Sequence, residues 1–362
     1  MFSRTLSFYF GRHFLKMVGG IFVLSMLLIS VTTLIEFFNR GLNGDAVIGL
    51  ELAALSLLRV PSIAEETLPF AILYGSIAAF VVANRRLELV VARAAGISAW
   101  RFLVPACLVG LVFGVVATAV YNPLAAMLLA RSNQLVAEVF VNKTPVDSGD
   151  RPVWLRQTGS GADSIIGAAA TFDEGLGLSG VTAFVHDADG AFRERVDAQR
   201  AFYTPGEWRL EDATITVPSE NPTHSDVYLL PTDLTPNEVK GTFLQLDSVS
   251  FWTLPGLAAS ARRAGVPADR YELQFNALLA RPILLLAMVL IAANVSLRFS
   301  RSRRLAPMII TGVAVGFMLY VLMKIARDLG SGGIVPPLFA AWLPAIVATL
   351  VGVTVLLHLE DG

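Results

Sequence analysis

Six long apolar runs constrain this chain more than any other feature of its 362 residues. A bilayer hydrocarbon core of about 30 Å is crossed by about 20 helical residues, and each run is long enough to cross it. Between the third and fourth runs lies a polar stretch rich in Gly, Pro, Asp and Thr. We therefore expect an integral membrane protein with a separate domain between two groups of three helices. The runs are roughly 15–36, 60–83, 101–123, 277–298, 305–326 and 334–357.

The composition agrees with this interpretation and excludes several kinds of site. The chain is 54% hydrophobic and 16% charged, whereas soluble domains are nearer a quarter charged. Its one cysteine, Cys107, excludes a disulfide within the chain and a cysteine metal cluster, and we expect no cofactor or metal. Arg4, Arg12 and Lys16 precede the first run, as in a signal peptide. Because that run is long and no small-x-small cleavage site follows, we expect a retained anchor.

Arginine and lysine gather in alternate connections, and this sets the expected orientation. The N-terminal segment and the connections after the second and fourth runs are basic, whereas those around 37–59 and 328–335 are poorer in Lys and Arg. Basic loops stay in the cytoplasm. Both termini are therefore expected to be cytoplasmic, with the polar domain on the far side, which is the periplasm in a Gram-negative cell.

The polar middle of the chain has the pattern of β-strands. Short alternating runs over 181–217 are broken at Asp189-Gly190 and Pro205-Gly206, which are turn signals. We expect helices 1–3 within 1–130, the β domain within 131–250 and helices 4–6 within 251–362. The segment 250–265 is expected to be helical. Five aromatic side chains are candidates for part of the β core: Trp154, Phe184, Phe202, Tyr203 and Trp208.

Several catalytic and transport chemistries lack their sequence signals. No Walker A pattern is present, so the chain is not expected to hydrolyse nucleotide. Gly175 to Gly180 matches G-x-G-x-x-G, but a strand pattern follows it where a dinucleotide site needs a helix, so we expect a β turn. Charges such as Glu65, Glu66 and Arg281 lie toward the outer ends of the spans, which counts against an ion-coupled carrier. No nucleic-acid partner is expected.

A short amphipathic helix is predicted between the second and third spans, over 84–97. Leu87, Val90, Val91, Ala94 and Ala95 share one face. Arginines and one acid lie off that stripe, namely Arg85, Arg86, Glu88 and Arg93. Amphipathicity alone favours an interfacial helix whose arginines face anionic lipid. The alternative is a lever that contacts a partner outside the membrane.

Four stretches, spread over essentially the whole chain, resemble the lipopolysaccharide export permease family of the LptF/LptG type, and the LptG branch more closely. The first two are Val60-Pro61 with Leu68-Pro69, and "RRLELVVARAAG" at 85–96. The others are "SARRAGVPADRYELQFNALLARPI" at 260–283 and "GGIVPPLFAAWLP" at 332–344. The resemblance implies an α+β membrane protein: six transmembrane helices with a periplasmic β-jellyroll-like domain inserted between helices 3 and 4.

The resemblance also implies a function and partners. The chain would be the non-catalytic permease subunit of an ATP-driven ABC-type transporter that takes lipopolysaccharide from the inner membrane toward the outer membrane. Its partners would be a paralogous six-helix permease (LptF type), a dimeric cytoplasmic ATPase (LptB type), a single-helix periplasmic partner (LptC type) and a periplasmic bridge protein (LptA type). A permease for another lipid or a lipoprotein, and a membrane scaffold without transport, are the alternatives.

Site residues follow from the resemblance and from charge. Glu88 resembles the acid of the family's coupling helix, so Arg85, Arg86, Leu87, Glu88 and Val91 are the expected ATPase contact. Basic residues at outer ends of spans are candidates for lipid A phosphates, with snorkelling as the alternative for each: Arg40, Arg131, Arg281, Lys324 and Arg327. For Lys324, a simple helix pair with Asp328 is a further alternative. The family's lateral gates suggest four small residues for close packing: Gly19, Gly20, Gly312 and Gly316.

Overall fold

The six expected spans are present as six long apolar helices. A computed structural model describes residues 4–41, 49–86, 88, 98–139, 153–159, 162–187, 190–218, 221–236, 238–239, 245–263, 267–299 and 305–361. Within this part of the chain, six helices are long and apolar enough to cross a bilayer. The spans are Phe8–Glu36, Ala53–Arg85, Trp100–Leu135, Asp269–Ser296, Pro307–Ser331 and Pro337–His358.

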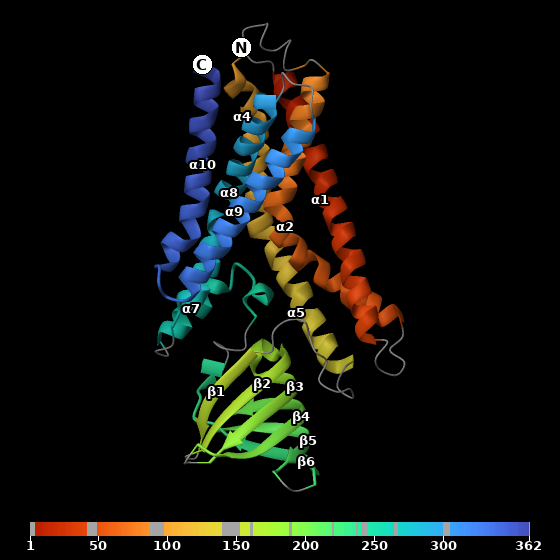
Figure 1. Ribbon diagram of the computed structural model, residues 1–362, viewed down its shortest axis with the longest axis vertical. Helices are drawn as coiled ribbons and strands as arrows, with labels where there is room; N and C mark the ends of the chain where they lie inside the picture. Colours follow the sequence, from red (N-terminus) through yellow and green to blue (C-terminus); the bar gives the residue numbers. More distant parts are fainter. Residues whose placement is uncertain are drawn as a thin grey trace.

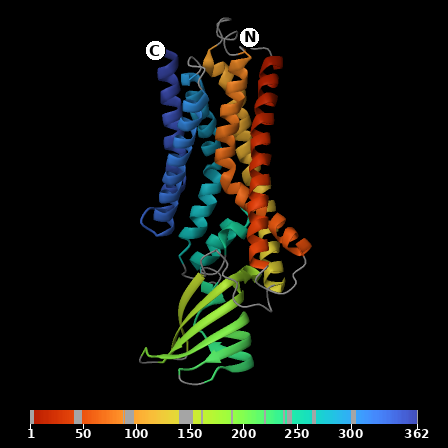
Figure 2. The ribbon, with the colours of Figure 1, turned by 45° about the vertical axis from the view of Figure 1, so that its right-hand side comes forward.

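The helices form one elongated body, and both chain ends lie at the end opposite the sheet (Figures 1 and 2). The third span combines α4, a five-residue π-helix (Ala117–Tyr121) and α5. A short amphipathic helix, α7, follows the sheet where a helix was expected. The helices are α1 (Arg4–Gly41), α2 (Gly49–Arg85), α4 (Ala99–Val116), α5 (Asn122–Val139), α7 (Leu254–Arg263), α8 (Asp269–Phe299), α9 (Leu305–Ser331) and α10 (Pro337–Asp361).

Helix α8 lies at the centre of this body because its middle is apolar on every side. It packs against α2, α4, α9 and α10, and Leu285 and the run from Ala287 to Ala293 are buried. Glycines let neighbours approach closely: a Cβ at Gly75 would lie 2.6 Å from Val18 Cα, and one at Gly114 would lie 2.5 Å from Pro282 Cα. By contrast, α1 and α9 expose large apolar side chains such as Leu28 and Phe317. These outer faces are suited to lipid or to another apolar helix.

The middle of the chain folds into one six-stranded antiparallel sheet, with strands in sequence order. Turns between strands use glycine where φ is positive: Pro205-Gly206 joins β4 to β5, with φ +95° at Gly206. Gly175, with φ +88°, ends the turn between β2 and β3, which confirms a turn there. The strands are β1 (Val153–Gly159), β2 (Ala162–Phe172), β3 (Gly177–His186), β4 (Phe192–Thr204), β5 (Glu207–Thr216) and β6 (Thr223–Pro231).

The sheet curls around its own apolar core, as expected for a jellyroll-like domain. Trp208 on β5 is fully buried, and its indole N–H donates to Gln157 Oε1 on β1 at 3.1 Å. Thr232, just after β6, donates to the same oxygen at 2.8 Å. These bonds join strands that are not neighbours in the sheet. Gln157 thereby connects the first strand to the last part of the sheet and closes the curl.

Three of the five expected core aromatics, Trp154, Phe184 and Phe202, lie outside the apolar core of the sheet. Trp154 is 48% exposed, and its ring stacks near Phe184 with centroids 5.9 Å apart. Trp154 pairs across the strands with Gly167, and a Cβ at Gly167 would lie 2.6 Å from the indole ring. The absence of a side chain at Gly167 gives the indole its place outside the core. The expectation that Trp154 contributes to the core is therefore wrong.

Candidate functional site

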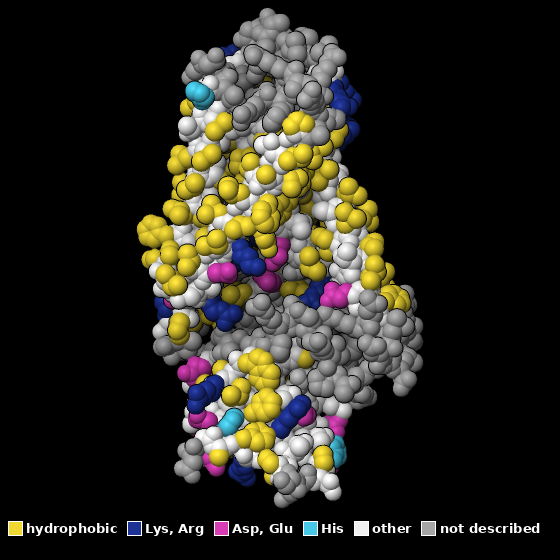
Figure 3. All heavy atoms as spheres, in the orientation of Figure 1, with side chains coloured by type: hydrophobic (Ala, Val, Ile, Leu, Met, Phe, Trp, Pro, Cys, Tyr) yellow, Lys and Arg dark blue, Asp and Glu magenta, His cyan; other side chains and the backbone are white. Residues whose placement is uncertain are grey.

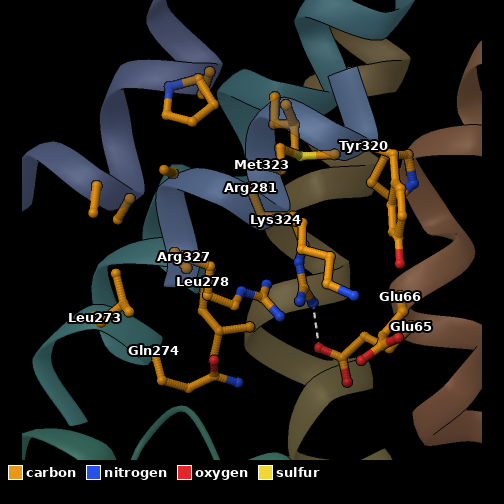
Figure 4. Close-up of a pocket in the computed structure, with 18 of the residues that line it drawn as sticks. Glu65, Glu66, Leu273, Gln274, Leu278, Arg281, Tyr320, Met323, Lys324 and Arg327 are labelled. Atoms are coloured by element: carbon orange, nitrogen blue, oxygen red, sulfur yellow. Dashed lines mark hydrogen bonds and ion pairs between the residues drawn. The ribbon is translucent and has the colours of Figure 1, made fainter. Parts of the chain in front are cut away.

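A pocket of about 350 Å³ opens in the half of the helical body nearer the sheet, between α2, α8, α9 and α10 (Figure 4). Three expected head-group residues line it: Arg281 from α8, and Lys324 and Arg327 from α9. Figure 3 shows basic and acidic side chains gathered on this face and framed by hydrophobic ones. The pocket therefore brings together charges that the sequence separates by up to 46 residues on two helices, and it does so beside apolar surface.

Arg281 is held by a largely buried ion pair with Glu65 on α2. The two side chains are 15% and 9% exposed. Asn122, at the start of α5, donates from Nδ2 to Glu65 Oε1 at 2.9 Å. The same side chain accepts the backbone N–H of Phe251 at Oδ1, at 2.8 Å. Glu65 is thus a partner of two helices besides its own.

Lys324 and Arg327 differ from Arg281 because both are exposed. Among the described residues, neither has a carboxylate oxygen within 4.0 Å, so the simple helix pair of Lys324 with Asp328 is not formed. Figure 4 shows both side chains reaching from α9 into the space that Arg281 also borders. The lining also contains the carboxylates of Glu66, Asp247 and Asp328. The pocket is therefore mixed in charge, with two cations open to a ligand.

The other two head-group candidates lie elsewhere. Arg131 is on α5, is exposed, and donates to Gln134 Oε1 at 3.2 Å. It does not line the pocket. Arg40 is near the end of α1, but its side chain lies outside the described residues. Three of the five candidates therefore converge on one site.

A second cluster lies at the opposite end of the helical body, near the chain termini. Tyr9 on α1 donates its hydroxyl hydrogen to Glu88 Oε1 at 3.1 Å and accepts from Arg86 Nη1 at 3.4 Å. Arg85 ends α2 and is exposed. Leu87, Val91 and most of the expected helix 84–97 lie outside the described residues. The expected coupling acid is thus in direct contact with the first helix.

Comparison with known proteins identifies the family. The model of the lipopolysaccharide export system permease family LptF/LptG matches residues 8–358, nearly the whole chain. The chain belongs to this family. The lipopolysaccharide export system permease protein LptG of Haemophilus influenzae is 25% identical over 358 residues, covering 95% of each chain. LptG of Escherichia coli strain K12 is 22% identical over 342 residues, covering 92% of this chain and 93% of its own. The protein is therefore a multi-pass membrane permease of lipopolysaccharide export.

In this permease, the four candidate gate glycines fall into two groups. A Cβ at Gly312 would lie 2.7 Å from Ile77 Cδ1, and one at Gly316 would lie 3.0 Å from Leu73 Cδ2. These two glycines therefore allow α9 to approach α2 of the same chain. Gly19 and Gly20 on α1 have nothing within 4 Å of a built Cβ. Only the α1 pair faces open space.

Sequence reasoning missed Asn122 and Tyr9. Asn122 is 2% exposed and lies at the end of the apolar run 101–123, so a polar residue in an apolar run was the available signal. Buried polar groups need partners, and this requirement marks such a residue for attention. Tyr9 precedes the first apolar run and gave no signal, because its partner Glu88 is 79 residues away.

Proposed function

We propose that this chain is the permease subunit of an ATP-driven ABC-type transporter in the bacterial inner membrane. It extracts lipopolysaccharide from that membrane and passes it to a periplasmic bridge. The open cations of the pocket carry this proposal: Lys324 and Arg327, beside Arg281, offer donors to the phosphates of lipid A. Charge-assisted hydrogen bonds from Arg and Lys to phosphate are among the strongest available to proteins.

The surroundings of the pocket suit the rest of the lipid. Burying a methylene is worth about 0.8 kcal/mol, so a long acyl chain needs a continuous apolar environment. The exposed apolar faces of α1 and α9 supply such surface next to the pocket side of the body, with Leu28 61% and Phe317 64% exposed. We propose that these faces meet the acyl chains and a second six-helix permease of the LptF type.

The proposed orientation places both termini in the cytoplasm and the sheet in the periplasm. Both termini and the Tyr9–Glu88 contact lie at the end opposite the sheet, and Arg85 and Arg86 lie at that end too, as basic residues on the cytoplasmic side do. The β domain, within 131–250, would then receive the lipid and meet the LptC-type and LptA-type partners. Domains 1–130 and 251–362 would form the transmembrane part.

ATP hydrolysis is assigned to a separate dimeric ATPase of the LptB type. We propose that the segment 84–97 contacts it, with Glu88, Arg85 and Arg86 as polar contacts and Leu87 and Val91 on the apolar stripe. Support comes from the resemblance of Glu88 to the family's coupling acid. Because Glu88 also accepts from Tyr9, a force on this segment would reach α1.

Purification of the chain in mild detergent, with mass spectrometry of everything bound, tests this proposal. Recovery of an ATPase, a second permease and lipid A together is the expected result. Recovery of the ATPase with another lipid or a lipoprotein would mean that this other molecule is the transported substrate. Absence of any ATPase would contradict the coupling role and favour an interfacial helix or a scaffold.

A further inference from the structure

A chain of buried contacts leads from the pocket to the segment that returns from the sheet. It begins at Arg281 on α8, passes through Glu65 on α2 and Asn122 on α5, and ends at the backbone N–H of Phe251. Asn122 is 2% exposed and Phe251 is 8% exposed. Figure 4 shows the Arg281–Glu65 pair at the border of the pocket. Three transmembrane helices and the returning segment thus share one polar network.

Buried ion pairs are expensive, and this network shows how the cost is offset. Removing two charges from water costs several kcal/mol per ion, unless hydrogen bonds complete the pair. Asn122 provides such a hydrogen bond, because its Nδ2 donates to Glu65 Oε1. Its other end accepts from Phe251. A flipped amide would set its oxygen against the carboxylate, so both contacts fix one orientation of Asn122.

Apolar packing and further hydrogen bonds also hold the returning segment, because Val249, Phe251 and Leu254 are buried in one cluster with Leu278 of α8. The Phe251 ring stacks on Phe275 of α8, with centroids 5.1 Å apart and 13° between planes. Trp252 donates from Nε1 to the carbonyl of Ala119 in the π-helix, at 3.1 Å, although it is 65% exposed. The Asn122 bond connects the Phe251 backbone to the Arg281–Glu65 pair, whereas Asp247 of the same segment lines the pocket directly. A change at Arg281 therefore has a short route to the segment.

We propose that Glu65 and Asn122 are positioning residues that connect anion binding at Arg281 to the hydrogen bond between Asn122 and the Phe251 backbone N–H. This inference rests on the proposed function, because the anion is the lipid phosphate. A phosphate that binds Lys324 and Arg327 competes with Glu65 for the Arg281 guanidinium, because both acceptors are anionic. As Arg281 turns to the phosphate, Glu65 loses its counter-ion and pulls the Asn122 amide group toward its carboxylate. The Oδ1 atom of Asn122 is thereby moved away from the Phe251 N–H, so this hydrogen bond weakens and the Phe251 amide opens more often when the pocket fills.

Hydrogen exchange in the full chain, with and without lipid A, tests this inference. The peptide 249–253 contains the Phe251 amide, and its exchange is expected to rise several-fold when lipid A binds. In Asn122→Ala the same amide should exchange rapidly whether or not lipid A is present. In Glu65→Gln lipid A should bind several-fold more tightly, because Arg281 is free, and the response of the peptide to lipid should be lost.

Asn133→Ala provides a matched control. Asn133 lies on the same helix and donates to Gln245 in the same returning segment at 2.9 Å, but it does not line the pocket. Its variant should keep the response of peptide 249–253 to lipid A. Lipid A binding without any change in that peptide would overturn the inference and leave the proposed function standing. Absence of lipid A binding to the wild-type chain would instead overturn the proposed function.

Discussion

Thr118 donates its hydroxyl hydrogen to the backbone carbonyl of Leu278, at 2.9 Å, across two buried helical segments. Leu278 lies four residues before Pro282 in α8. Because proline has no N–H, this carbonyl has no helical donor at the usual position. Thr118 lies in the π-helix of the third span, and such irregular turns often occur at functional positions. The Thr118 side chain thus supplies the hydrogen-bond donor that Pro282 cannot provide, beside the pocket.

Thr118→Val keeps the shape of the side chain and removes this bond. We expect the free energy of unfolding to fall by about 1–2 kcal/mol, since a buried carbonyl is left without a donor. Unfolding in mixed detergent measures the change. Thr349→Val is the control, because the Thr349 hydroxyl bonds only to Ala345 of its own helix. Equal effects of the two substitutions would show that the Leu278 carbonyl finds another donor.

Arg281→Gln should be among the most destabilising single substitutions in the helical body. It leaves the Glu65 charge buried without a counter-ion, which costs about 3–5 kcal/mol. The double variant Arg281→Gln, Glu65→Gln removes both charges and should recover most of that loss. The unfolding free energies of the four proteins form a double-mutant cycle. Additive effects would mean that the pair is not coupled.

Much of the fold was predictable from the sequence because a bilayer restricts what can cross it. Every backbone group in hydrocarbon must bond internally, so long apolar runs become helices, and all six were predicted. The partner of Arg281 was not predictable, because Glu65 is 216 residues away and helix rotation decides which side chains meet. Alternation predicted strands, but it did not say which face of the sheet is inside, and Trp154, Phe184 and Phe202 were wrongly assigned to the core for that reason.

Glu88→Lys is expected to weaken association with the ATPase by about tenfold or more, since it reverses the charge of the proposed contact. Co-purification of the ATPase measures this. Glu207→Lys makes the same charge change on β5, at the other end of the molecule, and should have no effect. Unchanged co-purification of the Glu88 variant would refute the coupling role of this residue.

Tyr9→Phe should leave binding of the ATPase unchanged but weaken the coupling of ATP hydrolysis to lipid extraction. The variant loses the bond from the Tyr9 hydroxyl to Glu88 but keeps the acid itself. We expect unchanged association and a several-fold rise in ATP hydrolysed per lipid extracted, measured in reconstituted vesicles. Wild-type stoichiometry in this variant would show that α1 is not driven through Tyr9.

The stability of the sheet is expected to fall at high pH because of Tyr228. Burial and its hydrogen bond to Glu194 raise the pKa of Tyr228 from the ordinary 10.0 to about 12. A raised pKa means that the contribution to stability is complete below pH 10 and is lost as the pH rises through 12. The difference in tyrosinate absorbance between the wild type and Tyr228→Phe should have its midpoint near the higher value. A midpoint near 10 would contradict the partly buried hydrogen bond from Tyr228 to Glu194.

Binding of lipid A to the purified chain tests whether the pocket between α2, α8, α9 and α10 holds the lipid head group. The double variant Lys324→Gln, Arg327→Gln removes the two open cations of the pocket, whereas Arg131→Gln removes one outside it. Exposed charge pairs are worth up to about 1 kcal/mol each, so we predict that the double variant binds about tenfold more weakly and that Arg131→Gln binds like the wild type. Equal affinity of all three proteins would contradict the assignment of this pocket to the lipid head group.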